Sequence, residues 1–159
     1  MRPSKDKYYL NIAKEVAQRS TCLRRRFGAI IIRDDQIIST GYTGAPRGAP
    51  NCIDVGECVR EKLKIPSGER YELCHSVHAE LNAIINAARA GASILGGTMY
   101  LFGENMDGTL IEELKSCQMC RRAIINAGLE RFVVLTKKGI EEFNPKDWLS
   151  SDIISLAGY

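Results

Sequence analysis

Three residues with zinc-binding side chains and one carboxylate stand at spacings that suit metal-assisted hydrolysis. His78 and Glu80 form a His-x-Glu motif, and Cys117 and Cys120 form a Cys-x-x-Cys motif further along the chain. Structural zinc sites usually close with four protein ligands, whereas catalytic zinc sites keep one position open for water. One imidazole and two thiolates leave that position open, and Glu80 can take the proton of the water as a general base. The sequence therefore predicts a catalytic zinc site in which these three side chains hold the metal and Glu80 is the catalytic residue.

Each half of this pattern has a more ordinary interpretation when it stands alone. A single histidine is most often structural, a Cys-x-x-Cys pair is most often redox-active or a structural zinc site, and a glutamate is most often a solvated helix residue. The combination of His-x-Glu with Pro-Cys-x-x-Cys is the signature of zinc-dependent nucleobase deaminases. This chain has all of it except the proline, which Ser116 replaces. Because that change removes neither a ligand nor the general base, we expect it to be tolerated and predict hydrolytic deamination of an amino-substituted heterocycle.

Hydrophobic spacing predicts four elements around the motifs: a helix over 77–90, a strand over 98–102, a helix over 119–127 and a strand over 131–136. Ser76 is the expected N-cap of the first helix, and Gly91 is its expected stop. Two helices joined through one strand lie on the same face of a sheet, and their N-termini meet at the edge formed by the carboxyl ends of the strands. His78 and Cys117 are therefore expected at one edge. Since side chains two positions apart in a helix point about 200° apart, His78 and Glu80 converge only on a metal beyond the helix end.

The rest of the chain completes an α/β arrangement. We expect an amphipathic helix over about 5–19, a hairpin of strands over 27–33 and 36–42, and a tail over 144–159 that packs back as a helix. This order fits a three-layer α/β/α sandwich with a mixed sheet of about five strands. No internal repeat or linker interrupts the sequence, so residues 1–159 are expected to form a single domain.

Composition and charge exclude several classes of protein. The 159 residues are 45% hydrophobic and 26% charged, which is usual for globular proteins. The formal net charge of +3 is too small to indicate a nucleic-acid-binding surface, so we expect no nucleic-acid partner. No apolar run approaches the roughly 20 residues that span a bilayer, and no signal-peptide core is present. We therefore expect no membrane association and a cytoplasmic location, where six cysteines favour metal binding over disulfides.

With these motifs in view, the chain resembles the deoxycytidylate deaminase branch of the cytidine deaminase superfamily over about residues 20–134. The similarity rests on five segments: Ser20-Thr21-Cys22-Leu23-Arg24, Gly28-Ala29, residues 41–48, residues 78–84 and residues 117–120. The resemblance implies a cytidine deaminase-like fold and conversion of dCMP to dUMP. It also implies a homo-oligomer, either a hexamer or a dimer, with dCTP and dTTP as effectors and magnesium accompanying them.

Two further features depart from the family pattern. Thr43 stands where the family has an asparagine that helps to hold the nucleotide, which leaves the choice of substrate open. The interval from Tyr100 to Cys117 is longer than usual, and this 103–116 insertion is expected to contain a helical turn over 110–114. We expect the insertion to line the site or to make an oligomer contact.

Four more cysteines lie outside the Cys-x-x-Cys motif, most of them in the irregular segment 43–76: Cys22, Cys52, Cys58 and Cys74. Some members of the resembled branch hold a second, structural zinc here, and the positions of Cys22 and Cys52 match that pattern. Four thiolates complete a tetrahedral site and hold a segment without a core of its own, and His75 is a substitute for one of them. The alternative is that some of these cysteines are small buried hydrophobic residues. We favour the second zinc.

A nucleoside monophosphate also needs cationic or backbone donors for its phosphate. Arginine suits multidentate phosphate contacts. Arg24 matches a family position and Arg47 lies in a family segment, so the predicted substrate-binding residues are Arg24, Arg47, Tyr42 and Thr43. Tyr100 remains open between flanking the base and packing in its strand. Asn82, on the catalytic helix, is expected to hold the neighbouring loop.

Two other functions stay open at this point. A deaminase of tRNA adenosine or of a free cytosine nucleoside would share the zinc motifs but needs different substrate contacts. A non-catalytic, zinc-stabilised partner subunit would need the ligands but not the Glu80 carboxylate, and the presence of Glu80 argues against it.

Overall fold

Five strands form one mixed sheet in the computed structural model, which describes residues 1–151. The strand order is β2-β1-β3-β4-β5. The strands are β1 (Arg25–Arg33), β2 (Gln36–Tyr42), β3 (Thr98–Asn105), β4 (Arg131–Thr136) and β5 (Gly139–Phe143). Within this sheet β3 and β4 are parallel and the other neighbouring pairs are antiparallel. The predicted mixed sheet of about five strands is confirmed.

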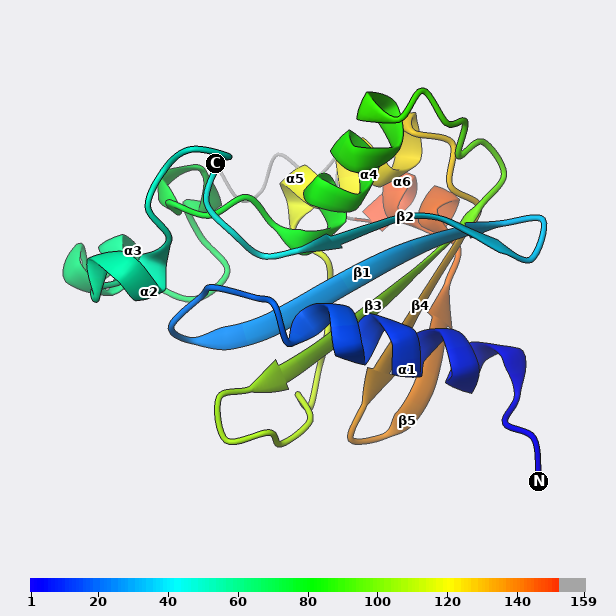
Figure 1. Ribbon diagram of the computed structural model, residues 1–159, viewed down its shortest axis with the longest axis horizontal. Helices are drawn as coiled ribbons and strands as arrows, with labels where there is room; N and C mark the ends of the chain where they lie inside the picture. The colour runs from blue at the N-terminus through cyan, green and yellow to red at the C-terminus, as the bar shows by residue number, and fades with distance from the viewer. Residues whose placement is uncertain (152–159) are drawn as a thin grey trace.

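Helices cover both faces of the sheet, which gives the predicted three layers (Figure 1). The long helices are α1 (Lys5–Ala17), α4 (Ala79–Arg89) and α5 (Gln118–Asn126). Helix α1 packs on one face, against β1 and β3, while α4 packs on the other face, against β2 and β1. Helix α5 lies beside α4 on that second face, so the two predicted helices do share a face.

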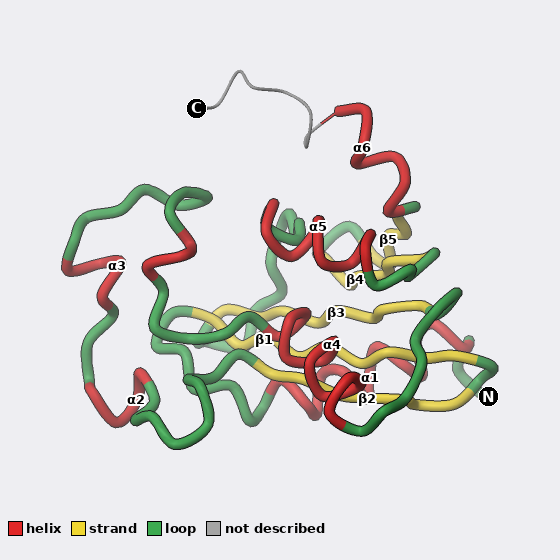
Figure 2. Tube along the Cα trace, turned by 90° about the horizontal axis from the view of Figure 1, so that it is seen from above, coloured by secondary structure: helices red, strands yellow, loops and turns green. Residues whose placement is uncertain are grey.

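The segment between β2 and α4 lies outside these layers. It carries three short helices, α2 (Cys52–Val55), α3 (Val59–Lys62) and the 3-10 helix η1 (Tyr71–Leu73). In both views α2 and α3 stand to one side of the sheet, beyond the end of β2 (Figures 1 and 2). This arrangement leaves the segment 43–76 in a position to wall one side of the sheet edge.

Two glycines allow the helices to approach the sheet at backbone distance. A Cβ on Gly41 in β2 would lie 2.3 Å from the backbone nitrogen of Ala83 and 2.6 Å from the carbonyl oxygen of Ala79. A Cβ on Gly28 in β1 would lie 2.3 Å from the backbone nitrogen of Ala17 in α1. Side chains at these two positions would force the helices outward. The first turn of α4 is therefore fixed closely against β2.

Most predicted elements are confirmed, and β3 is longer than expected. It continues past the predicted end at Phe102 because Glu104 and Asn105 still pair with the first residues of β1. The sequence did not locate β5. That strand is at the sheet edge, and its half-exposed and exposed side chains alternate, so it has little hydrophobic signal.

The prediction of a helical turn over 110–114 is wrong, and that of a helical tail over 144–159 is confirmed only in its first part. No helical turn forms over 110–114, because Leu110 pairs in a β-bridge with Glu104 while Ile111 and Leu114 are buried in the core from an irregular segment that bends at Glu112 and Glu113. The tail prediction holds for its first part. There, the 3-10 helix η2 (Pro145–Asp147) and α6 (Trp148–Ser151) form, and Trp148 packs at 5.4 Å from the Phe132 ring. The rest of the predicted tail helix lies outside the described residues.

Within residues 1–151 no helix combines the length and the hydrophobicity that a bilayer crossing requires. All six cysteines are free thiols, as expected from the preference for metal binding over disulfides.

A partly exposed ion pair joins α1 to the sheet on the face opposite α4. Asp6 accepts hydrogen bonds from Arg131 Nη1 and Nη2, each at 2.9 Å, and from the Tyr100 hydroxyl at 2.7 Å. Arg131 also donates to Glu142 of β5. The Arg131 hydrogen bond lowers the pKa of Asp6 from its ordinary value of 3.8, and burial opposes this shift. Tyr100 is thus a packing and hydrogen-bonding residue of this face.

We predict that Asp6→Asn lowers the free energy of unfolding by about 1–2 kcal/mol near neutral pH, because the Arg131 contact loses its charge. The folded-state pKa of Asp6 is below the unfolded value, so its contribution is complete above the unfolded pKa and disappears as the pH falls through the folded one. Urea denaturation of both proteins from about pH 7 to about pH 2 measures this. An equal gap at every pH would show that the charge of Asp6 is not involved.

Candidate metal centre and active site

The two chemical motifs begin two neighbouring helices. His78 is the N-cap residue of α4 and Cys117 is the N-cap residue of α5. Both have extended backbones, so their side chains leave from the helix ends. The prediction of Ser76 as the N-cap is therefore wrong. Because His78 precedes the first helical turn and Glu80 lies within it, the two side chains can reach the same space beyond the helix end.

Three ligand atoms gather in that space. His78 Nδ1 lies 3.4 Å from Cys117 Sγ and 3.4 Å from Cys120 Sγ, and all three atoms lie within 4.8 Å of one another. Zn–N bonds of about 2.0 Å and Zn–S bonds of about 2.3 Å at tetrahedral angles require ligand separations of about 3.5–3.8 Å. The observed spacing and the nitrogen-and-sulfur donor set both fit zinc. Within residues 1–151, no other group of three or more histidine, cysteine and acidic side chains has such spacing.

The pKa shifts of these groups follow from their mutual contacts. Burial lowers the pKa of His78, but hydrogen bonds with the thiols of Cys117 and Cys74 and the charge of Glu80 outweigh it, so the pKa rises to about 10. The hydrogen bond with Cys120 lowers the pKa of Cys117 to about 4, and the same contact raises that of Cys120. One thiolate is thus favoured before any metal binds, whereas the protons on His78 and Cys120 must leave when a metal takes their place.

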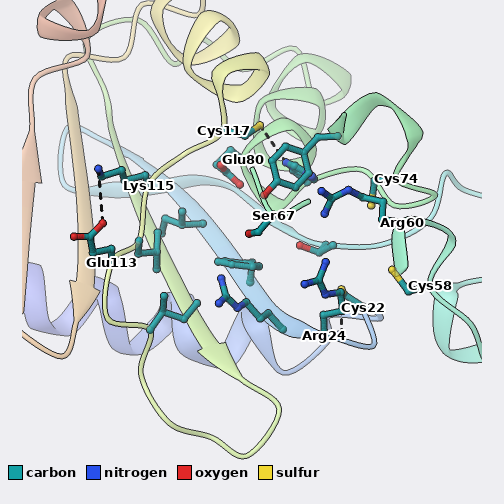
Figure 3. Close-up of a pocket in the computed structure, with 18 residues that line it drawn as sticks. Cys22, Arg24, Cys58, Arg60, Ser67, Cys74, Glu80, Glu113, Lys115 and Cys117 are labelled. Atoms are coloured by element: carbon teal, nitrogen blue, oxygen red, sulfur yellow. Dashed lines mark hydrogen bonds and ion pairs between the residues drawn. The ribbon is translucent and has the colours of Figure 1, made fainter. Parts of the chain in front are cut away.

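Glu80 is buried beside the ligands and forms hydrogen bonds with both Cys120 and Ser116. Its side chain is only 5% exposed. The Ser116 hydroxyl donates to Glu80 Oε2 at 2.7 Å. Figure 3 shows the Glu80 carboxylate next to Cys117 at one end of a pocket. The position suits a carboxylate that serves the metal site without being one of the three gathered ligands.

The pocket opens from this centre and is formed by two walls that lie far apart in the sequence. It encloses about 960 Å³, a volume that includes solvent space at its open mouth. The 103–116 insertion supplies one wall through Ile111, Leu114 and Lys115. Segment 43–76 supplies the other, including Arg60 and Tyr71. The expectation that the insertion lines the site is confirmed.

Two of the four predicted substrate-binding residues line the pocket, and two do not. Arg24 and Thr43 line the pocket, and the Thr43 side chain is buried. Arg47 lies outside that lining, because its guanidinium donates to Asn86 Oδ1 on α4 at 2.6 Å. Tyr42 is outside it as well, with its ring 6.0 Å from the guanidinium of Arg19. Proximity to a family segment in the sequence did not determine which side chains face the pocket.

Asn82 does what was expected of it on the catalytic helix. Its Nδ2 donates to the carbonyl oxygens of Tyr42 at 2.8 Å and Val77 at 3.3 Å. These bonds hold the end of β2 and the chain that leads into α4.

Sequence reasoning missed Arg60, which is 4% exposed and lines the pocket. Its guanidinium lies 4.2 Å from the Tyr71 ring centroid, and its Nη2 donates to the carbonyls of Pro66 and Glu69. Arg60 Nε has no hydrogen-bond partner, and it is the only buried side-chain nitrogen or oxygen within residues 1–151 of which this is true. One arginine in a short charged helix gives no signal of this role in the sequence.

The cysteines outside the ligand cluster occupy the same side of the pocket. Cys22, Cys58 and Cys74 line it, and Figure 3 shows them on the side of Arg60. Burial raises the pKa of Cys52, the charges of the other three thiols raise it further, and its hydrogen bond with Ser76 opposes this shift. In the part of the chain that the structure describes, these four sulfurs do not form a group as tight as the one at His78.

The histidine proposed as a substitute ligand is engaged elsewhere. His75 Nε2 lies 2.6 Å from the carbonyl oxygen of Pro50. A hydrogen bond with His78 lowers the pKa of Cys74, so this thiol is also in reach of the first metal centre.

Comparison with known proteins places the chain in a family. Residues 3–136 match the model of the cytidine and deoxycytidylate deaminase zinc-binding region. The deoxycytidylate deaminase of Mycobacterium phage D29 is 35% identical over 137 residues, which cover 83% of this chain and 94% of the phage protein. That of Enterobacteria phage T4 is 33% identical, with 85% and 86% covered. The deoxycytidylate deaminase of Schizosaccharomyces pombe is 42% identical over 88 residues, which are 55% of this chain and 27% of the yeast protein.

Solved structures show the same fold. The dCMP deaminase of cyanophage S-TIM5 in complex with dCMP and dUMP aligns with a TM-score of 0.60 at 24% identity, over 84% of this chain and 82% of the phage chain. A cytidine deaminase from Burkholderia pseudomallei gives the same TM-score of 0.60 at 17% identity, over 91% and 96%. Since the family model covers most of the chain and the structure brings the zinc-binding motifs together, the protein belongs to the cytidine and deoxycytidylate deaminase family of zinc-binding enzymes.

Proposed function

We propose that this protein deaminates dCMP to dUMP with a zinc ion held by His78, Cys117 and Cys120. The observation that carries the proposal is the grouping of these three ligand atoms with the buried Glu80 carboxylate at the end of one pocket. The names of the relatives support the nucleotide substrate, since three of them are deoxycytidylate deaminases.

The chain's own groups account for the proton transfers of this reaction. Zinc in this site supplies Lewis acidity, which makes water a nucleophile near neutral pH. Glu80 takes a proton from the attacking water as a general base. As the water oxygen adds to C4 of cytosine, the Glu80 carboxyl passes that proton to the ring nitrogen. Glu80 then takes the second proton from the new C4 hydroxyl and gives it to the amine, which leaves as ammonia while the C4 carbonyl forms. The products are dUMP and ammonia, and Glu80 is again ionised.

We propose Arg60 and Arg24 as the groups that receive the 5′-phosphate. Arg60 is a buried cation without an ion-pair partner among the described residues, and its Nε has a hydrogen bond still to make. Leaving a buried charge unpaired is costly, so an anionic ligand at this wall is favoured. Arg24 lines the same pocket and now pairs with Glu61 at 3.1 Å. We assign Thr43, which is buried in the lining, to the sugar or base.

We further propose a second, structural zinc on the cysteine-rich side of the pocket, with ligands from Cys22, Cys52, Cys58 and Cys74. Its support is that three of these thiols share the pocket wall and that the fourth is close enough for their charges to raise its pKa. Segment 43–76 has short helices and little core, so a metal would stabilise it strongly. His75 is the weaker candidate because its Nε2 faces a carbonyl.

Family resemblance supports the remaining parts of the proposal. We propose a cytoplasmic homo-oligomer, a hexamer or a dimer, in which residues 1–159 form one domain. Exposed apolar side chains on α2 and directly after α3 offer a surface for subunit contact: Ile53, Val55 and Leu63. We also propose dCTP and dTTP as effectors, with magnesium accompanying them.

The central prediction is that the purified zinc-loaded chain deaminates dCMP in preference to deoxycytidine, dCTP and a tRNA anticodon stem-loop. Glu80→Gln should lower kcat by about a thousandfold, because the general base is lost, while zinc content is retained. Ammonia release and metal analysis measure the two quantities.

Glu104→Gln is the matched control, since Glu104 is another buried carboxylate but pairs with Arg26 outside the pocket lining. Its kcat should not change. Turnover of the RNA alone would contradict the substrate assignment, and a wild-type level of activity in Glu80→Gln would contradict the mechanism.

A second prediction concerns the phosphate. Arg60→Gln should lower kcat/KM for dCMP by about 10-fold to 100-fold and affect deoxycytidine much less, because a charged hydrogen bond to the phosphate is removed. Arg47→Gln is the control, since Arg47 bonds to Asn86 away from the pocket. If Arg47→Gln changes the preference for dCMP and Arg60→Gln does not, the assignment is reversed.

A third prediction concerns the metal count. Metal analysis should give about two zinc ions per chain, and Cys58→Ser should lower the thermal midpoint while kcat changes little. Cys22→Ser serves as the companion variant from the same wall and should behave alike. A count of one zinc, unchanged in both variants, would mean that the segment is held without metal.

A further inference from the structure

Ser116 is the residue that breaks the family's Pro-Cys-x-x-Cys pattern, and its side chain touches the catalytic carboxylate. The hydroxyl donates to Glu80 Oε2 at 2.7 Å, which is short and well within hydrogen-bond range. Ser116 and Glu80 are only 4% and 5% exposed, so solvent does not compete for this bond. A proline at this position has no donor in either its side chain or its backbone.

The backbone that carries this hydroxyl is fixed from behind. Arg121 Nε donates to the carbonyl oxygen of Ser116 at 2.9 Å, and both residues are buried. The Arg121 guanidinium lies 5.1 Å from the ring centroid of Trp148, which itself packs edge-on against Phe132 of β4. The donor therefore sits on a rigid support that reaches into the core.

Glu80 needs such a contact because of the shape of its own side chain. The final torsion of a glutamate is broad, so burial alone does not set the plane of its carboxylate. With Oε2 occupied by Ser116, Oε1 is the oxygen left to take a proton from the nucleophile. Small errors in the placement of a reacting group reduce rates steeply.

We propose that Ser116 is a positioning residue whose hydroxyl fixes the Glu80 carboxylate in the orientation that serves the metal's open position. The serine that replaces the family proline thus supports catalysis through its contact with Glu80. The inference rests on the proposed deaminase function.

Three substitutions test the role in the zinc-loaded enzyme. Ser116→Ala should lower kcat for dCMP by about 10-fold to 100-fold and leave KM nearly unchanged, because the substrate contacts remain while Glu80 is misaligned. Ser116→Thr should restore most of kcat, since the hydroxyl is retained. Ser116→Pro, the family residue, should behave like Ser116→Ala if it folds.

Ser39→Ala is the matched control. The Ser39 hydroxyl is also buried and also donates to α4, at 2.8 Å to the carbonyl oxygen of Ala83, but it does not contact Glu80. Both alanine variants remove one buried hydroxyl against the same helix, so both should lose stability. Only Ser116→Ala should lose kcat.

Zinc-loaded crystals of wild type and Ser116→Ala give a readout that does not depend on activity. We expect the Glu80 carboxylate to be rotated or to occupy two positions in Ser116→Ala, with the three metal ligands in place. An unmoved carboxylate, or an unchanged kcat in an active Ser116→Ala, would overturn the role of Ser116 while leaving the deaminase function intact. Wild type that is inactive on dCMP would contradict the proposed function instead, and the crystal comparison would still decide on Ser116.

Discussion

The metal centre depends on one constraint: α4 and α5 must begin at the same edge of the sheet. Parallel pairing of β3 with β4 brings the chain back across the sheet through α5, so Cys117 at the start of α5 faces His78 at the start of α4. Close contact between β2 and α4 at Gly41 fixes the distance of α4 from the sheet. Without the parallel pairing of β3 with β4, or without the close contact of β2 with α4, the two motifs would lie apart and could not bind one metal ion.

Helix ends are well suited to this task. A residue at an N-cap has an extended backbone, and its side chain reaches beyond the start of the helix. The side chains of His78 and Glu80 can therefore reach the same space without lying on one helix face. The helix N-termini also favour negative charge, which agrees with the lowered pKa of Cys117. The Glu80 carboxylate and the three grouped side chains therefore share a largely buried space in which charge interactions are strong. Oriented hydroxyls such as that of Ser116 matter in such a space because water does not replace them.

The two walls of the pocket come from segments that are irregular in sequence. Segment 43–76 brings Arg60 and the cysteines, and the 103–116 insertion brings apolar side chains and Lys115. The wall residues Arg60, Ile111 and Leu114 lie outside the strands of the sheet. Substrate recognition can therefore change at such positions while the metal centre stays the same. This division agrees with the shared fold of deaminases whose names give different substrates.

The extent of prediction from sequence follows the same division. Periodic hydrophobic residues and clear chemical motifs were sufficient for α1, β1 to β4, α4, α5 and the grouping of His78, Cys117 and Cys120. The edge strand β5 had no periodic signal, and the spacing of Ile111 and Leu114 resembled a helix although both are buried from an irregular, bent segment. Arg47 and Tyr42 were placed by sequence proximity, whereas the direction of a side chain in a loop depends on contacts such as Arg47 with Asn86. The Ser116 contact joins residues 36 positions apart, so it required the three-dimensional structure.

A crystal structure of the zinc-loaded protein with anomalous scattering at the zinc edge tests the metal centre most directly. We expect an anomalous peak bonded to His78 Nδ1 and to the sulfurs of Cys117 and Cys120, with a non-protein ligand in the fourth position beside Glu80. Absence of a peak at these three atoms would contradict this assignment, and so would a fourth protein ligand that closes the site.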